Sequence, residues 1–356
     1  MITIALVGKG WRSRFIKRIT ASHPDLFKIG ALIVKPEADR KSLEEEWGCP
    51  VFSSLSEMKR HSQCLFVFIA VPREFASSYI KEAVLLDLPV LVETPPASSY
   101  EELIDLYNFV QSRQGFVQVA EQYFLQPLNQ ARLNIIEKGL IGSPSQAQVS
   151  AGHEYHGISL IRKFLNVGFE MPDITVQRFC SPLVEPRNRD AYPPEEKIIN
   201  SEQLLCHLSY KGKLGVLDFD ENQYFSPIRN SRFLIRGERG EIQNRDVSYL
   251  LDYKTSVQLT INRSSLGIEE NLEGRGLESL NLGIDEVYNN PLGTSTLADD
   301  EIALATALLE MDGAITTGKG FYPLAEGAQD YYLSLLCQNA QGTGRTVVGQ
   351  APPWSQ

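Results

Sequence analysis

Hydrophobic residues in the first third of the chain gather in short continuous runs, and the segments between these runs have the amphipathic pattern of helices. Continuous apolar runs are typical of strands that a sheet buries on both faces. This alternation of strands and helices predicts a parallel sheet covered by helices on both faces. The predicted strands are Ile2 to Val7, Lys28 to Val34, Leu65 to Val71, Pro89 to Val92 and Phe116 to Ala120, and the predicted helices are Arg12 to Ala21, Lys41 to Trp47, Phe75 to Leu86 and one that begins near Ser99.

The pattern changes beyond Tyr123. Residues 128–136 suit one helix, and short apolar runs separated by turn residues then predict a largely antiparallel sheet. The stretch from Asn262 to Thr296 has no hydrophobic period, so we expect a long excursion or lid there. A helix from Leu297 to Met311, capped by Thr296, and another with Pro323 in its first turn complete the prediction. The strand-like runs are Thr175 to Phe179, Gln203 to Tyr210, Leu214 to Phe219, Phe233 to Arg236, Glu241 to Gln243 and Ser256 to Ile261.

Length and composition narrow the class of protein. A chain of 356 residues exceeds one ordinary core, so we expect two domains. With 34 basic and 44 acidic residues the net charge is −10, which argues against a nucleic-acid surface and favours simple solubility. The N-terminus lacks signal-peptide features and no apolar run approaches the ~20 residues that cross a bilayer, so we expect a cytoplasmic protein. Five dispersed cysteines indicate neither a disulfide framework nor a zinc site.

A glycine-rich loop follows the first predicted strand and opens the first predicted helix, which is the context of a dinucleotide-binding loop. Its sequence is Gly8-Lys9-Gly10-Trp11-Arg12-Ser13. Gly8 would make the tight turn, Gly10 would let backbone N–H groups approach a pyrophosphate, and Ser13 is small enough to keep helix and strand close. Trp11 and Arg12 would stand beside the cofactor. The alternative is a turn with a purely structural role.

The end of the second predicted strand bears on the choice of cofactor. Proteins specific for NAD carry an Asp or Glu there for the ribose 2′-hydroxyl. This chain has Lys35 instead, which could meet a 2′-phosphate. The sequence therefore favours NADP(H) slightly over NAD(H). The alternative is that Lys35 is an exposed loop lysine.

Together with the loop, three later motifs resemble the Gfo/Idh/MocA family of oxidoreductases. They are Ala70-Val71-Pro72 and Glu93-Thr94-Pro95 at strand ends, and Ala120 to Pro127 before a helix. The resemblance covers nearly the whole chain. It implies an α/β protein with a Rossmann domain over residues 1–122 and an α+β domain over residues 123–356, whose sheet is open-faced and mostly antiparallel. We expect the helix at about 323–341 to pack back on the first domain.

The resemblance also implies a function and the residues near the cofactor. Typical members oxidise or reduce a sugar, cyclitol or related carbonyl compound between the two domains, and many are dimers or tetramers packed sheet to sheet. We therefore expect a small sugar-like substrate and a homodimer or homotetramer formed through the C-terminal sheet. By position, Val71, Pro72, Glu93 and Pro95 would border the cofactor. The bond that corresponds to Thr94–Pro95 is often cis in the family.

Two departures from the family pattern concern catalysis. Thr94 occupies the place of the family's lysine, and Gly152 that of an aspartate four residues before His156. A threonine hydroxyl does not titrate near pH 7, so another group must move the proton. His156 and His153 are the first candidates, because imidazole titrates near 6.5.

Other residues of this region are further candidates. Tyr123 and Tyr155 could act as hydroxyl donors if their pKa values are lowered, and Arg162 could bind an anionic or polyhydroxylated substrate. Read as a strand, residues 153–156 would put His153 and Tyr155 on one face. The alternative is a cluster of satisfied polar groups. No third clear ligand suggests a metal site.

These features support three functional hypotheses. The leading one is an NAD(P)-dependent oxidoreductase for a sugar-like or other small carbonyl or imine substrate, with a proton relay that lacks the family lysine. The second is a non-catalytic dinucleotide-binding regulatory protein. The third is a lyase or glycosidase that recycles its hydride internally.

Overall fold

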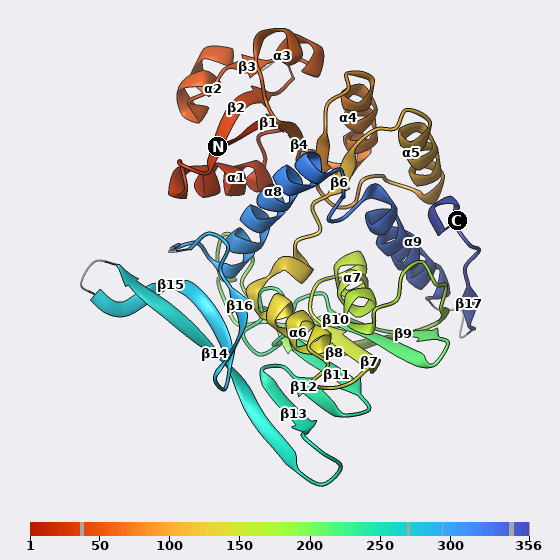
Figure 1. The fold of residues 1–356 in the computed structure, drawn as a ribbon. Coiled ribbons are helices and arrows are strands. Elements are labelled where there is room, and N and C mark those ends of the chain that lie inside the picture. The colour runs from red at the N-terminus through yellow and green to blue at the C-terminus, as the bar shows by residue number, and fades with distance from the viewer. Residues whose placement is uncertain (36–38, 269–270, 294, 342–344, 356) are drawn as a thin grey trace.

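The computed structural model describes residues 1–35, 39–268, 271–293, 295–341 and 345–355. Its first domain is a six-stranded sheet in the order β3-β2-β1-β4-β5-β6 (Figure 1). All of its strand pairs are parallel, as predicted. The strands are β1 (Ile2–Val7), β2 (Phe27–Ile33), β3 (Val51–Phe52), β4 (Phe66–Ile69), β5 (Val90–Val92) and β6 (Val117–Val119). The helices are α1 (Trp11–Ser22), α2 (Arg40–Trp47), α3 (Leu55–His61), α4 (Arg73–Leu85) and α5 (Tyr100–Ser112).

Two short elements of this domain, β3 and α3, were missed by the sequence analysis. β3 has two residues, too few for a periodic signal, and it pairs with the end of β2. α3 has seven residues and begins where the Ser54 hydroxyl accepts a hydrogen bond from the Glu57 N–H at 3.1 Å. The same cap starts α5, where Ser99 accepts from the Glu102 N–H at 3.2 Å, as the Ser-x-x-Glu spacing predicts.

The second domain is built on a sheet of 11 strands in the order β16-β15-β14-β13-β12-β11-β7-β10-β9-β8-β17. Of its strand pairs, β7–β10 is parallel and the others are antiparallel, so the predicted fold class is confirmed. Helices α6 (Pro127–Glu137) and α7 (Glu154–Leu165) follow the short 3₁₀ turn η1 (Tyr123–Leu125), and α7 packs on β7 and β10. The strands are β7 (Pro144–Ser150), β8 (Asp173–Val184), β9 (Ile198–Tyr210), β10 (Lys213–Asp220), β11 (Arg232–Gly237), β12 (Gly240–Gln243), β13 (Asp246–Leu250), β14 (Ser256–Ile268), β15 (Asn271–Leu282), β16 (Asp285–Asn289) and β17 (Val347–Val348).

The expected excursion between Asn262 and Thr296 is wrong for most of its length. β14 runs on to Ile268 and forms a long hairpin with β15, and β16 pairs with β15 (Figure 1). Residues 269, 270 and 294 lie outside the described part of the chain. The signal was missing because Asn262, Arg263 and Ser265 on this hairpin are exposed. A strand that buries few side chains shows no alternation of apolar and polar residues.

Helices α8 (Asp299–Thr317) and α9 (Leu324–Ala340) join the two domains. α8 packs on α1 and η1, while α9 packs on α7, α5 and β6. The Val119 N–H of β6 donates to the Tyr322 carbonyl at 2.8 Å. Both helices begin slightly later than predicted, since Ala298 and Pro323 occupy the N-cap positions. The last segment contains the 3₁₀ turn η2 (Pro353–Ser355).

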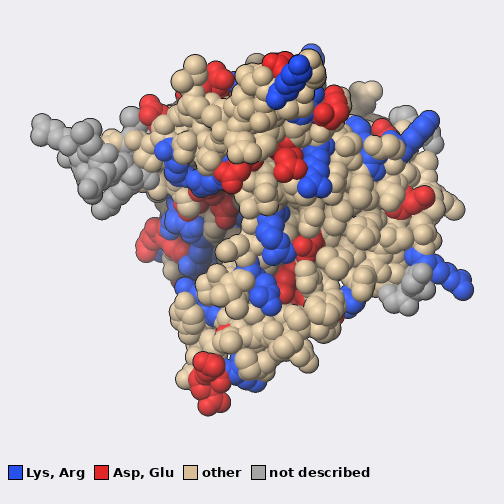
Figure 2. Space-filling model, turned by 90° about the horizontal axis from the view of Figure 1, so that it is seen from below, with Lys and Arg blue, Asp and Glu red and all other residues tan. Residues whose placement is uncertain are grey.

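The surface has no single dominant charge on the face that Figure 2 presents, where Lys, Arg, Asp and Glu side chains are interspersed. None of the helices in the described ranges combines the length and hydropathy needed to cross a membrane.

Candidate functional site

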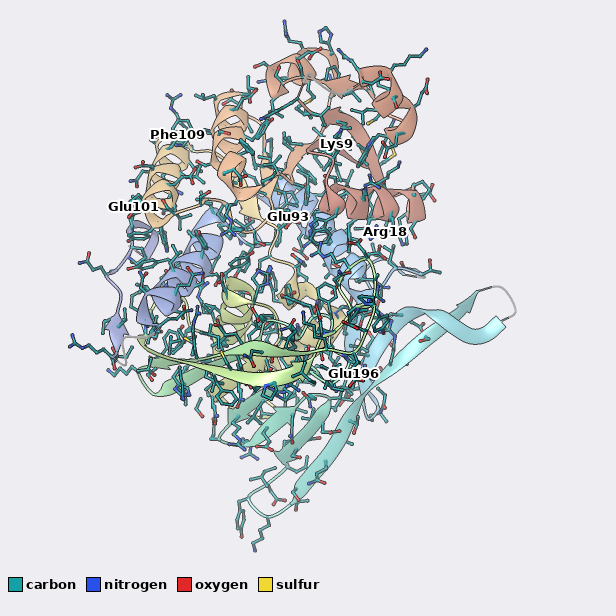
Figure 3. All side chains as sticks on the ribbon, turned by 180° about the vertical axis from the view of Figure 1, so that it is seen from behind. Lys9, Arg18, Glu93, Glu101, Phe109 and Glu196 are labelled. Atoms are coloured by element: carbon teal, nitrogen blue, oxygen red, sulfur yellow. The ribbon has the colours of Figure 1, made fainter. Side chains whose placement is uncertain are left out.

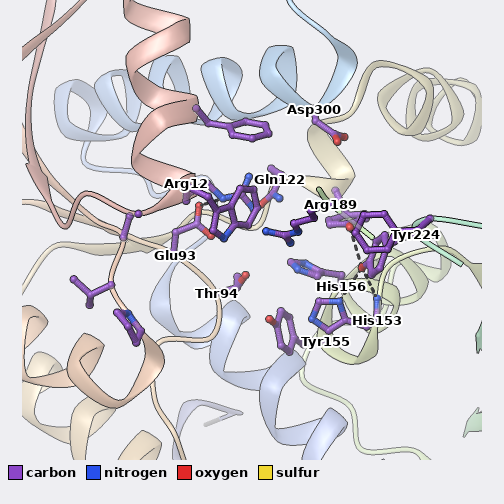
Figure 4. Close-up of a pocket in the computed structure, with 18 residues that line it drawn as sticks. Arg12, Glu93, Thr94, Gln122, His153, Tyr155, His156, Arg189, Tyr224 and Asp300 are labelled. Atoms are coloured by element: carbon purple, nitrogen blue, oxygen red, sulfur yellow. Dashed lines mark hydrogen bonds and ion pairs between the residues drawn. The ribbon is translucent and has the colours of Figure 1, made fainter. Parts of the chain in front are cut away.

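A cavity of about 790 Å³ lies between the domains, at the carboxyl ends of β1, β4 and β5 (Figure 4). β1 pairs with β2 on one side and β4 on the other, so the order of the strands reverses here. Such a switch point is where open α/β sheets bind ligands. Eleven of the predicted site residues line the cavity: Gly10, Trp11, Arg12, Val71, Pro72, Glu93, Thr94, Tyr123, His153, Tyr155 and His156.

The turn between β1 and α1 depends on Gly8. Its φ is +100°, and a Cβ at this position would lie 2.4 Å from the carbonyl oxygen of Ala70 on the neighbouring strand end. Ser13 closes the turn, because its hydroxyl donates to the Gly8 carbonyl at 2.9 Å. The backbone therefore requires glycine at position 8 and a small polar residue at position 13.

The start of α1 suits a phosphate group. In the described part of the chain no side chain caps this helix, and its first turn carries no acid, so its first N–H groups keep their donor capacity for a ligand. A Cβ on Gly10 would meet no protein atom within 4 Å, so the space beside this backbone is open. A helix N-terminus of this kind binds anions through N–H groups and the helix dipole. The loop therefore fits the pyrophosphate of a dinucleotide.

Lys35 and Pro95 do not line the cavity. Lys35 follows β2, and its Nζ lies 4.5 Å from the centre of the Phe75 ring at the start of α4. The Thr94–Pro95 peptide bond is cis. Thr94 itself lines the cavity, as Tyr155 does (Figure 4).

An ion pair spans the cavity wall between α1 and the end of β5. The Arg12 Nε lies 2.8 Å from the Glu93 carboxylate, at the boundary of the two domains (Figure 3). Burial raises the pKa of Glu93, and the positive charge of Arg12 partly offsets this effect. When the amide nitrogen of Gln122 donates to the Ala120 carbonyl, its oxygen accepts from Arg12 at 2.9 Å. Arg12 is therefore held across the carboxyl edge of the sheet.

The segment from Gly152 to His156 is not the strand that we expected. His153 is the N-cap residue and α7 begins at Glu154. Gly152 has a φ of +70°, and a Cβ there would lie 2.8 Å from the His156 Cβ and 3.0 Å from the Tyr123 ring. Left-handed backbone at Gly152 starts the helix and turns His156 toward Tyr123. A side chain at position 152, such as the aspartate that the resemblance implies, would collide with both neighbours.

His156 forms a buried pair with Glu121, which the sequence analysis missed. Its Nδ1 lies 2.6 Å from one Glu121 oxygen, and the other oxygen accepts from the Tyr123 N–H at 3.0 Å. Burial raises the pKa of Glu121 and lowers that of His156, so neither group gains a charge easily. The Tyr123 ring stacks on the imidazole at 4.3 Å. The sequence does contain a signal for Glu121, because this acid comes directly after a buried strand, where a parallel sheet places its site residues.

A second chain of polar groups links His153 to Tyr123 through Tyr224. The Tyr224 hydroxyl lies 2.8 Å from the His153 Nδ1 and 3.1 Å from the Tyr123 hydroxyl. Burial lowers the pKa of His153 to about 4 and raises the pKa values of both phenols. The lowered tyrosine pKa values that direct proton donation would need are absent at Tyr123 and also at Tyr155, whose pKa is raised by burial. These groups are neutral hydrogen-bonding partners for a ligand.

Arg162 lies away from the cavity. It is 2% exposed, and its guanidinium pairs with Asp330 at 2.5 Å and with Glu326 at 2.7 Å. It also donates to the Gly168 carbonyl at 2.9 Å. The structure thus gives Arg162 the role of fastening α7 to α9, in place of the substrate contact that we expected.

The fold and this site are those of a two-domain protein with a Rossmann-type dinucleotide-binding domain. Residues 2–121 match the family model described as "Oxidoreductase family, NAD-binding Rossmann fold". The first domain thus matches the Gfo/Idh/MocA family of oxidoreductases, in agreement with the resemblance predicted from the motifs. The match supports NAD binding and gives no support to the predicted preference for NADP. No curated protein matches the chain.

Solved structures share the fold over nearly the whole chain. Levoglucosan dehydrogenase in complex with NADH and levoglucosan has a TM-score of 0.69 at 16% identity, over 99% of each chain. An oxidoreductase from Agrobacterium radiobacter in complex with NAD+, L-tartaric acid and magnesium has a TM-score of 0.68 at 14% identity, over 97% of this chain and 98% of that one. A myo-inositol dehydrogenase from Corynebacterium glutamicum has a TM-score of 0.66 at 16% identity, over 98% of this chain and 99% of that one.

Proposed function

We propose that this protein is an NAD(H)-dependent dehydrogenase that interconverts a hydroxyl and a carbonyl group on a small, sugar-like substrate. The observation that carries the proposal is the meeting of an uncapped phosphate loop and the buried Glu121–His156 pair in one cavity. The similarity of fold to inositol and levoglucosan dehydrogenases supports a polyhydroxylated substrate.

In this proposal one side of the cavity binds the cofactor and the other side carries out the proton transfer. Gly8 and Gly10 shape the loop whose N–H groups receive the pyrophosphate, and Glu93 and Thr94 lie where the strand end would border the nicotinamide. When bound, the nicotinamide accepts or supplies the hydride. The protein then has to move one proton between the substrate oxygen and a side chain.

His156 is our candidate for that proton. Its Nδ1 is occupied by Glu121, which leaves Nε2 for the substrate. For His156 to accept a proton at Nε2, Glu121 must be ionised and accept the Nδ1–H hydrogen bond, and its pKa of about 8 makes this form more abundant as the pH approaches 8. His156 is the catalytic residue of this proposal and Glu121 its positioning residue. Thr94 and Tyr155 would orient a substrate hydroxyl without changing their own ionisation.

We propose Lys35 as the residue that determines the preference between NADH and NADPH. The acid that contacts the 2′-hydroxyl in NAD-specific proteins is missing at this position, and a cation stands there. We therefore propose that the loop also accepts NADPH, with Lys35 close to the 2′-phosphate.

We also propose that the chain assembles as a homodimer or homotetramer through the large sheet. Large apolar side chains of β8 and β9 are exposed, with Phe179 at 52% and Ile198 at 59%. Light scattering of the purified protein measures the mass, and a monomer at working concentration would contradict this part of the proposal.

The proposal is tested first with a fluorescence titration of the purified chain with NADH and NADPH. Neutral sugars and cyclitols are then screened for net NADH formation. Cofactor binding together with turnover is the expected result. Binding without net turnover of any substrate would favour a regulatory protein or an enzyme that recycles its hydride. Absence of binding in folded, nucleotide-free protein would overturn the proposal.

A further inference from the structure

One arginine of the cavity has no acidic partner among the residues that the structure describes. Arg189 lies between β8 and β9, and in the view of Figure 4 its side chain reaches into the cavity between Arg12 and His156. Its guanidinium carbon stacks 4.4 Å from the centre of the Trp11 ring. Among the ion pairs formed by described residues, none includes Arg189, whereas Arg12 pairs with Glu93.

Each acid that lines or borders this cavity interacts with a group other than Arg189. Glu93 is held by Arg12, and Glu121 by His156. Asp300 is in the first turn of α8, where a helix N-terminus stabilises a carboxylate. It also accepts a hydrogen bond from the Gln126 amide at 2.6 Å. The charge of Arg189 is therefore left for a ligand.

The turn that carries Arg189 is stabilised by hydrogen bonds among its own residues. The Asn188 side-chain oxygen accepts from the N–H groups of Asp190 and Ala191, both at 2.8 Å. The Asn188 N–H donates to the Ala191 carbonyl at 2.9 Å. This turn presents Arg189 to the first domain, where Trp11 supports the flat face of the guanidinium.

The groups near Arg189 are suited to hydroxyls. His153, Tyr123 and Tyr224 are uncharged and can donate or accept hydrogen bonds. A ligand that matches the whole cavity therefore carries several hydroxyls and one anionic group. Arginine is the side chain that best fits a carboxylate, because its fork of N–H donors matches the two oxygens.

We propose that the substrate is a sugar acid, a polyhydroxylated compound with one carboxylate that pairs with Arg189. This inference rests on the proposed dehydrogenase function and narrows its substrate class. Arg189 then selects the substrate by charge, while the hydroxyl that reacts lies at His156.

The test compares neutral sugars with the uronic acids of the same stereochemistry, such as glucose with glucuronate and galactose with galacturonate. For each pair, kcat/KM with NAD+ is measured on the full chain and on Arg189→Gln. The wild type is expected to favour one acid over its neutral counterpart. In Arg189→Gln that acid-to-neutral ratio should fall by about tenfold or more, the usual effect of losing a charge-assisted hydrogen bond. Arg187→Gln is the matched control, because Arg187 is exposed on the same segment and stacks on Tyr192 outside the cavity.

Three results would overturn the inference. One is equal use of acids and neutral sugars by the wild type. Another is an unchanged ratio in Arg189→Gln, and a third is weaker NAD+ binding by that variant with the ratio retained, which would assign Arg189 to the cofactor. If nothing is turned over, calorimetry with the uronates and NAD+ separates the two proposals. Acid binding that Arg189→Gln loses would support the anion site although the dehydrogenase function had failed, and no binding by the wild type would refute the site.

Discussion

The two walls of the cavity are built in different ways. The cofactor wall is one continuous stretch, residues 8–13, whose shape depends on backbone conformation and on the absence of side chains. The opposite wall presents His156 and Tyr224, and Glu121 is hydrogen-bonded to His156 beneath the surface, so three separate segments contribute. One wall therefore depends on local geometry, and the other on the packing of the two domains.

The two walls should therefore respond differently to substitution. Replacing a glycine of residues 8–13 should weaken cofactor binding. Removing a side chain of the opposite wall should lower the rate of catalysis and leave cofactor binding nearly unchanged.

Removal of the His156 imidazole should distinguish the functions of the two walls most clearly. His156→Ala is expected to lower kcat by ~100-fold or more, because general acid–base groups contribute about that much. NADH affinity should stay within a few-fold of the wild type, since the loop is untouched. Steady-state kinetics and a fluorescence titration measure the two quantities. An unchanged kcat would remove His156 from the mechanism.

Alanine substitutions in the loop should distinguish fold from binding. Gly8→Ala forces a non-glycine residue to φ +100° and places its Cβ 2.4 Å from the Ala70 oxygen. We expect it to reduce the free energy of unfolding by about 1–3 kcal/mol and to weaken NADH binding. Gly10→Ala meets no protein atom within 4 Å, so it should weaken NADH binding while the melting temperature stays near that of the wild type. Equal melting temperatures for both variants would contradict this distinction.

The Glu121 carboxyl should make stability depend on pH. Burial raises the pKa of Glu121 to about 8, so the folded state holds a proton that the unfolded chain has released above its ordinary pKa of 4.5. This contribution is fully present below the unfolded pKa and is lost as pH rises through about 8.

Between pH 7 and 8 the lowered pKa values of His156 and His153 oppose this effect only weakly, because most of each imidazole is neutral in both states there. The wild type should therefore lose up to about 1 kcal/mol of unfolding free energy across this window. Urea titrations of the wild type and Glu121→Gln measure it. A slope that persists in Glu121→Gln would refute the assignment to Glu121.

The smallest expected effect concerns Lys35. Lys35→Glu replaces a cation by the residue type that NAD-specific loops use. Because an exposed charge contributes little, the ratio of NADPH to NADH affinity should fall only a few-fold, and more at low salt. Lys28→Glu, an exposed lysine near the opposite end of the same strand, is a control for net charge. A ratio that does not change would leave Lys35 as an ordinary loop lysine.

Local patterns in the sequence predicted the first domain well. Its strands are buried on both faces, so they appear as continuous apolar runs, and the Gly8 turn follows directly from one of them. The same reasoning failed on β15, where the adjacent residues Ser279 and Leu280 are both buried, so that buried and exposed positions do not alternate strictly. It also misassigned residues 153–156, since the helix there starts from the left-handed backbone of Gly152, and apolar periodicity does not report that conformation.

The sequence by itself determined the parallel sheet and the glycine-rich turn after β1, because each is encoded by neighbouring residues. Only the tertiary structure decided which charges meet. It paired His156 with Glu121 and Arg12 with Glu93, assigned Arg162 to Asp330, and left Arg189 facing the cavity without an acid among the described residues. Such contacts join residues up to 168 positions apart. They depend on how α7, α9 and the two sheets pack, and the spacing of residues along the chain does not predict that packing.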